Sequence, residues 1–163
     1  MSIVQQLTDC SAARKILQKY PREQRYTLAI LQDLQKEYNY IPRETLDLLA
    51  AHLSVPLSKL YGLATFYKSL SLTPKGDNII KVCDGTACHI RSSLLLVDEI
   101  QKQLGIAPGE TTADGVFSLE TVNCLGSCAI APVMVVNETY YGKVAPPMIR
   151  GILEEYGRVT DER

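Results

Sequence analysis

The chain has 163 residues, 46% of them hydrophobic, and a formal net charge of −1 at pH 7. This length and composition suit one ordinary domain, or a compact domain with a smaller appendage. The near-neutral net charge argues against sequence-independent binding of nucleic acid, which needs a basic surface. No apolar run reaches the ~18–20 residues that a membrane-spanning helix requires.

The cysteine content and the N-terminus predict the compartment. The first residues lack a basic region followed by an apolar core, so we expect no secretory signal. Five cysteines in such a chain indicate the reducing cytoplasm, where paired thiols more often bind metal or do redox chemistry than form structural disulfides. The sequence therefore predicts a soluble cytoplasmic protein without direct membrane insertion.

The first half of the chain is predicted to be helical. Three segments place apolar residues at helical spacing, and Pro42 and Pro56 separate them. The stripes consist of Leu28, Leu31, Leu34 and Tyr38, then Leu46, Leu49, Ala50 and Leu53, then Leu60, Leu63, Ala64 and Tyr67. We interpret these stripes as the core of an N-terminal helical bundle, residues 1–76, which ends at the turn-rich stretch 72–78.

The second half, residues 77–163, changes its periodicity. Strands are predicted at 79–82, 117–122, 133–136 and 140–144, with the wholly apolar 133–136 expected at the centre of a sheet. A helix capped by Ser92 or Ser93 is expected to end at Gly105, and a last helix to run from Pro146 to near Gly157. The order β-α-β followed by β-β-α predicts a small α/β sandwich resembling thioredoxin, and an α+β fold class for the whole chain.

Four cysteines form two tight pairs, Cys83-x4-Cys88 and Cys124-x3-Cys128, with 35 residues between the pairs. Each pair follows a predicted strand and encloses small residues, which let backbone amides approach a metal-bound sulfur. The spacing suits a [2Fe–2S] cluster and equally suits structural zinc. It does not match the C-x-x-C of thioredoxin-like redox disulfides.

Other residues that could bind or react are assigned simpler roles. Cys10 stands alone, and a cluster needs only four thiolates, so we expect it to be a free thiol. His89 directly follows a cysteine and is expected to be exposed or to donate a hydrogen bond to a ligand, whereas His52 is expected at the surface. Lys81 and Arg91 lie near the cysteine loops and would soften the negative charge of an all-thiolate cluster, or be ordinary solvated charges. No phosphate-binding glycine loop and no serine–histidine–acid arrangement is found, so no catalytic residue is assigned.

The segments around the cysteines carry a family resemblance. Residues 82–91, VCDGTACHIR, and 120–132, ETVNCLGSCAIAP, closely resemble the two cluster loops of the 24-kilodalton-type [2Fe–2S] subunit family of respiratory complex I. Residues 38–42, YNYIP, and 60–67, LYGLATFY, are similar to the N-terminal signatures of that family, so the resemblance covers roughly residues 23–156. It departs at Ser92 and Ser93, where many members of the family have glycine.

The resemblance implies a fold, a cofactor and partners. It implies a thioredoxin-like ferredoxin domain with one [2Fe–2S] cluster per chain, held by Cys83, Cys88, Cys124 and Cys128. It also implies a non-catalytic, electron-transfer subunit that works beside a flavin- and NAD(P)-binding subunit and further iron–sulfur or catalytic subunits. The assembled oxidoreductase would be a hydrogenase, including the electron-bifurcating kind, a formate dehydrogenase or a complex I-type NADH dehydrogenase. The alternative from another class is a zinc-stabilised interaction module without redox activity, and a third is a metal-free adaptor.

Overall fold

The computed structural model describes residues 10–157. The chain divides into two compact units, Met1–Pro74 and Lys75–Arg163. The predicted boundary, between residues 76 and 77, lies two residues further along the chain. Within the described residues, no helix has the length and apolar character that a bilayer crossing requires.

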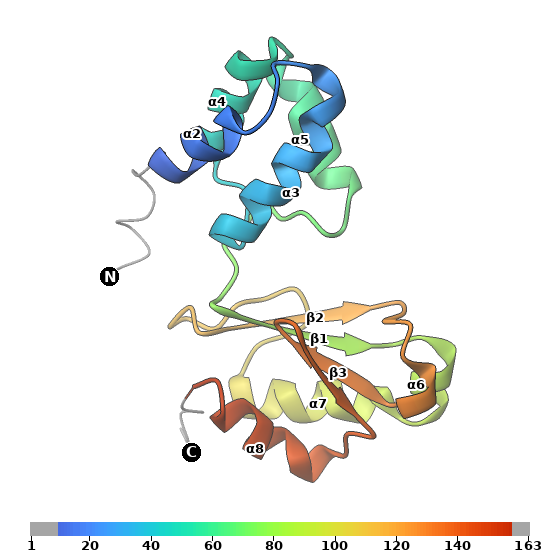
Figure 1. Ribbon diagram of the computed structural model, residues 1–163. Coiled ribbons are helices and arrows are strands. Elements are labelled where there is room, and N and C mark those ends of the chain that lie inside the picture. The colour runs from blue at the N-terminus through green and yellow to red at the C-terminus, as the bar shows by residue number, and fades with distance from the viewer. Residues whose placement is uncertain (1–9, 158–163) are drawn as a thin grey trace. The chain divides into compact units, whose positions relative to one another are not determined.

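The described part of the N-terminal unit is helical (Figure 1). Its elements are α2 (Ser11–Gln18), a 3₁₀ turn η1 (Gln24–Tyr26), α3 (Thr27–Tyr38), α4 (Arg43–Leu53) and α5 (Leu57–Phe66). The predicted stripes form its core, since Leu31, Leu34, Leu46, Leu49 and Leu60 are all fully buried. Helix α2, which sequence periodicity did not predict, adds the buried residues Ala13, Ile16 and Leu17.

The C-terminal unit contains a four-stranded mixed sheet. Its elements are β1 (Asn78–Cys83), α6 (Thr86–Ile90), α7 (Ser93–Leu104), β2 (Phe117–Val122), η2 (Cys128–Ile130), β3 (Val133–Val136), β4 (Thr139–Gly142), η3 (Pro146–Met148) and α8 (Ile149–Glu154). The strand order is β2-β1-β3-β4, with β1 parallel to β2 and the other neighbouring pairs antiparallel. The predicted hairpin and the central, fully buried strand β3 are confirmed.

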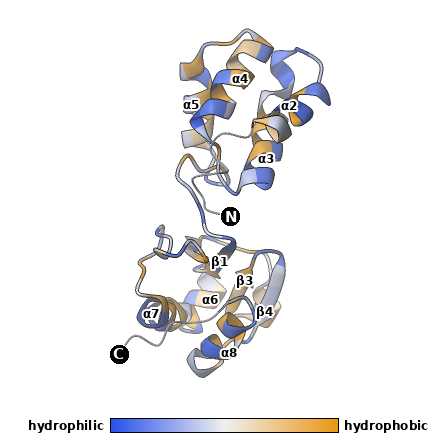
Figure 2. Ribbon diagram, turned by 90° about the vertical axis from the view of Figure 1, so that its left-hand side faces the viewer, coloured by the Kyte–Doolittle hydropathy of each residue, from blue (hydrophilic) through white to orange (hydrophobic). Residues whose placement is uncertain are grey.

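Helices α7 and α8 lie on one face of this sheet (Figure 1). Because alternate strand residues point to opposite faces, Ile80 and Val82 pack with these helices in the main core. Cys83 instead belongs to a small separate cluster with Cys88, Ala131 and Val133. Figure 2 shows the hydrophobic character of β3, an inner strand whose four residues are all buried.

The caps of α7 confirm one prediction and correct another. Gly105 ends the helix in the left-handed conformation, with φ of +68°, as expected of a terminal glycine. Ser92 precedes the helix but also has a positive φ, +62°, and makes no side-chain capping hydrogen bond. The hydroxyl of Ser93 points elsewhere and donates to Asp84 Oδ1 at 3.4 Å.

Candidate metal centre

The first cysteine pair is delivered by the end of β1 and the short helix α6. Strand β1 ends at Cys83, and Gly85 precedes α6, which carries Cys88 in its first turns. The prediction placed Cys88 in a loop, whereas the structure places it in this helix. Cys83 and Cys88 are 3% and 1% exposed, so the pair lies within the small apolar cluster.

The second cysteine pair lies in the segment that follows β2, at the same edge of the sheet. Strands β1 and β2 are parallel, with Cys83 in register with Val122, so the segment after β2 begins beside the segment after β1. The Asp84 amide donates to the Val122 carbonyl at 2.8 Å, and this hydrogen bond joins the segment after β1 to the end of β2. Cys124 follows two residues later and Cys128 opens η2, and both are exposed.

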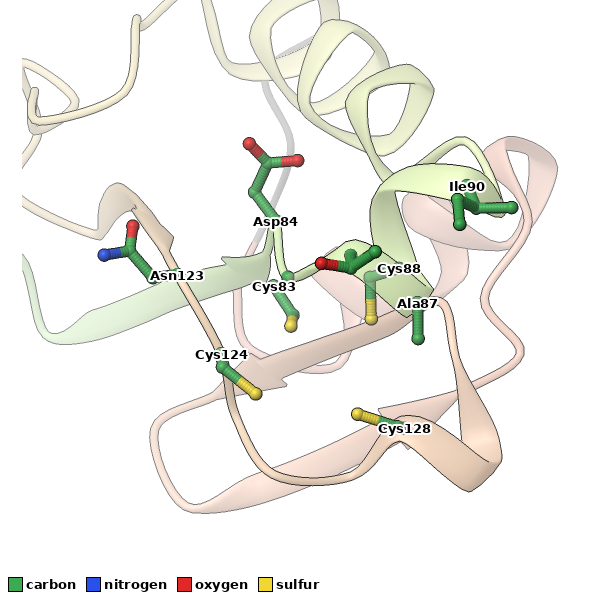
Figure 3. Close-up of a pocket in the computed structure, with 10 residues that line it drawn as sticks. Cys83, Asp84, Ala87, Cys88, Ile90, Asn123, Cys124 and Cys128 are labelled. Atoms are coloured by element: carbon green, nitrogen blue, oxygen red, sulfur yellow. The ribbon is translucent and has the colours of Figure 1, made fainter.

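The four cysteines meet at one open pocket of about 670 Å³. Figure 3 shows their sulfurs turned toward a common space, two from the β1–α6 segment and two from the segment after β2. Asp84, Gly85, Ala87, Ile90 and Asn123 also line this pocket. Two segments that are far apart in the sequence thus present their thiols to one site.

Gly85 permits the close approach of the two segments. A Cβ atom at this position would lie 2.7 Å from the carbonyl oxygen of Asn123, which is backbone and cannot rotate away. Gly126 has a different role, because its φ of +76° is a conformation that glycine adopts without strain. In that conformation its amide donates to the sulfur of Cys124 at 3.3 Å.

Backbone amides also act on the buried pair. Burial by itself would raise the pKa of the Cys83 thiol, but hydrogen bonds from the amides of Gly85 and Leu125, and from Cys88, bring that pKa below its usual value. Burial, together with the hydrogen bond to Cys83, raises the pKa of the Cys88 thiol, although the Val133 amide acts in the opposite direction. Amide donors therefore already point at these sulfurs, as metal-bound thiolates require.

The donor set fits a dinuclear iron–sulfur group. Four thiols with amide donors around an open pocket supply the ligands that a [2Fe–2S] cluster uses. Four thiols are also a ligand set that structural zinc uses, so the donor set fits both metals and the cofactor is identified by the family to which the chain is similar.

Polar residues beside the pocket take specific partners. The ring nitrogen Nδ1 of His89 lies 2.8 Å from Asp84 Oδ1, and both side chains are partly exposed. Arg91 donates from Nη1 to the carbonyl oxygen of Ala131 at 3.1 Å. The sequence indicated a charge near the loops but could not identify this carbonyl, which is 40 residues away in the chain.

The remaining predicted residues do not line the pocket. Cys10 immediately precedes α2 in the N-terminal unit and is a free thiol. His52, expected at the surface, is half-buried, and its Nε2 lies 3.3 Å from the carbonyl oxygen of Tyr20. Ile90 was not predicted to matter, yet it lines the pocket while 77% exposed.

Comparison with known proteins gives consistent findings. The model of the family described as thioredoxin-like [2Fe–2S] ferredoxin matches residues 13–157. The chain is 37% identical to the HndA subunit of the NADP-reducing hydrogenase of Solidesulfovibrio fructosivorans, over 87% of this chain and 83% of that protein. It is 36% identical to one of the subunits of the NADH-quinone oxidoreductase of Pseudomonas aeruginosa, over 91% and 90% of the two chains.

Solved structures show the same fold. An NAD⁺-reducing [NiFe]-hydrogenase in its H₂-reduced state aligns with a TM-score of 0.70 at 21% identity. The alignment covers 86% of this chain but 26% of that chain, so this protein corresponds to about a quarter of the larger one.

Proposed function

Because the chain belongs to the thioredoxin-like [2Fe–2S] ferredoxin family, we propose that it is the electron-transfer subunit of a multisubunit, NAD(P)H-linked oxidoreductase. Its cofactor is a [2Fe–2S] cluster, and Cys83, Cys88, Cys124 and Cys128 are its proposed ligands. The observation that carries the proposal is the meeting of these four thiols at one pocket (Figure 3). When bound, the cluster supplies exchange of single electrons.

The two cysteine pairs would hold the [2Fe–2S] cluster in different surroundings. Cys83 and Cys88 are packed among apolar side chains, which fixes their positions and excludes water from that side. Cys124 and Cys128 are exposed, so a partner protein can approach the site from their side. Amides of Gly85, Leu125, Gly126 and Val133 stabilise negative charge on the sulfurs.

The proposal assigns no substrate chemistry to this chain. A flavin- and NAD(P)-binding partner would exchange electrons with the site, and further iron–sulfur or catalytic subunits would complete the enzyme. The N-terminal helical bundle is proposed as a docking unit for that partner. The reducing cytoplasm is the proposed compartment, since the thiols must stay reduced to bind iron.

Iron and sulfide analysis of anaerobically purified or reconstituted protein tests the cofactor and its ligands. We expect about two irons and two acid-labile sulfides per chain, with visible absorption from sulfur-to-iron charge transfer. A colourless protein with one tightly bound zinc and no labile sulfide would establish the zinc-stabilised module instead.

The terminal reaction depends on the partners. Identities of 37% and 36% to a hydrogenase subunit and to a quinone-linked subunit do not separate these reactions. Purification of the complex from its native source should recover a flavoprotein together with a hydrogenase, a formate dehydrogenase or quinone-linked subunits, and the recovered cofactors then define the reaction. Recovery of the chain without any flavoprotein would contradict the proposed partner.

A further inference from the structure

Arg91 connects the two cysteine segments by hydrogen bonds at both of its ends. Its backbone amide donates to the carbonyl oxygen of Cys88 at 3.0 Å. Its side chain donates from Nη1 to the carbonyl oxygen of Ala131 at 3.1 Å. The amide of Ala131 in turn donates to the carbonyl oxygen of Cys128 at 3.2 Å. A continuous path of hydrogen bonds therefore joins the backbone of one cysteine in each pair.

The second pair of cysteines is less buried than the first, although Leu125 and Ala131 of its segment pack in the apolar cluster of Cys83 and Cys88. None of the three residues of η2 is buried, and Cys124 and Cys128 are both exposed. The Lys143 amide donates to the Ile130 carbonyl at 2.7 Å and joins this segment to the chain after β4. Cys128 itself is exposed, so its position depends on the contacts of the residues around it, among which the hydrogen bond from Arg91 to Ala131 links it to the α6 side.

The acceptor of the Arg91 side chain is a carbonyl that needs a partner. Ala131 is 1% exposed, and a buried carbonyl without a hydrogen bond destabilises the fold. A guanidinium donor gives a stronger bond than a neutral donor, and its planar group has fixed donor directions. Arg91 is itself exposed, so its contribution comes from this bond at its tip rather than from burial of the side chain.

We propose that Arg91 is a positioning residue that holds the Cys128 segment against the Cys88 segment and so preserves the spacing of the four sulfurs. The inference rests on the proposed function, because it takes the four cysteines as cluster ligands. Arg91 touches neither a substrate nor, in this proposal, the irons, and it acts through the backbone to which the ligands belong.

The test compares cluster loss in three variants of the cluster-loaded, full-length protein. Arg91→Met removes the hydrogen bond at similar side-chain size, and Arg91→Lys keeps the charge with a single, less directional donor. Arg150→Met is the matched control, because it removes an exposed arginine of the same unit whose Nε pairs with Glu154 at 3.0 Å on α8. The measured quantities are the rate at which an iron chelator bleaches the visible absorption and the urea unfolding of each apo protein.

We expect Arg91→Met to lose its cluster about tenfold faster than wild type, since the energy of one charged hydrogen bond corresponds to at least that factor. Arg91→Lys should lose its cluster at an intermediate rate, and Arg150→Met should match wild type. Because Arg91→Met leaves the buried carbonyl of Ala131 without its donor, that apo protein should also be less stable, whereas the apo forms of Arg91→Lys and Arg150→Met should stay close to wild type. Wild-type kinetics in Arg91→Met would overturn the inference. So would fast loss that merely follows lower apo stability, with the lysine variant no better than methionine. A wild-type protein without iron and labile sulfide would instead overturn the proposed function and this inference with it.

Discussion

Replacing Gly85 with alanine should push the two cysteine segments apart. The new Cβ would lie 2.7 Å from the carbonyl oxygen of Asn123, whereas close carbon–oxygen contacts in proteins are about 3.3–3.6 Å. The segments would have to separate by on the order of 0.6 Å. Gly85 has an extended backbone with φ of −65° and ψ of 158°, which alanine adopts freely, so the contact alone causes the strain.

The magnitude follows from two opposing effects. Overpacking of this kind lowers the free energy of unfolding by about 1–3 kcal/mol. The lower chain entropy of alanine in the unfolded state raises it by about 0.4–1 kcal/mol. We therefore expect the Gly85→Ala apo protein to be destabilised by about 1–2 kcal/mol. Because the strained contact separates the ligands themselves, cluster retention should fall by about 5–30-fold.

Gly151→Ala provides a matched control in the same unit. Gly151 lies in α8, is exposed, and a Cβ there would meet nothing within 4 Å. Alanine should be neutral or stabilise the helix by up to about 1 kcal/mol. Urea unfolding of the apo proteins and chelator-driven bleaching of the loaded proteins measure both effects. If Gly85→Ala kept its stability and its cluster as well as Gly151→Ala, the close contact between the segments would not exist in solution.

Three further changes test other parts of the site and its unit. Cys88→Ser should abolish stable cluster binding, because it removes a buried ligand, while Cys10→Ser should keep full iron and sulfide content; iron loss from both alike would refute the ligand assignment. Gly126→Ala places a side chain at φ of +76°, which costs about 1–2 kcal/mol, and should speed chelator bleaching without a steric clash; an unchanged rate would show that the left-handed conformation at this position does not support cluster retention. Hydrogen bonds, first from the Thr112 hydroxyl, lower the pKa of Asp114, so its stabilising effect is present above its usual pKa and is lost as the pH falls through the lowered value. Asp114→Asn should therefore unfold less steeply with acid below about pH 4 in urea titrations, and an unchanged pH profile would contradict that sign.

Much of the secondary structure follows from local sequence. The stripe residues Leu31, Leu34, Leu46 and Leu49 are buried as predicted, because helical periodicity depends on residues only three or four positions apart. Gly105 ends α7 as expected for the same reason. The cysteine spacing and the strands before each pair were also visible in the sequence. Together with the family resemblance, they predicted the thioredoxin-like [2Fe–2S] fold that the family match confirms.

Local rules failed at three places. Ser92 or Ser93 was expected to cap a helix, and Ser92 does stand at the N-cap position, yet it has a positive φ and makes no side-chain capping bond. Helix α2 was missed, although three of its residues complete the core of the N-terminal unit. The segment with Cys88 was predicted as a loop, whereas it forms α6 beside the buried cluster.

The sequence by itself determined which residues could bind metal, because ligand chemistry and short spacing are properties of the chain. Tertiary structure decided that Cys83 and Cys88 are buried while Cys124 and Cys128 are exposed. It also decided that Gly85 faces the backbone of Asn123 and that Arg91 reaches Ala131. These contacts join residues about 40 positions apart, and the register of β1 against β2 and the packing of the segments after them set which atoms meet. That register is fixed by burial across the whole sheet, which no short stretch of sequence contains.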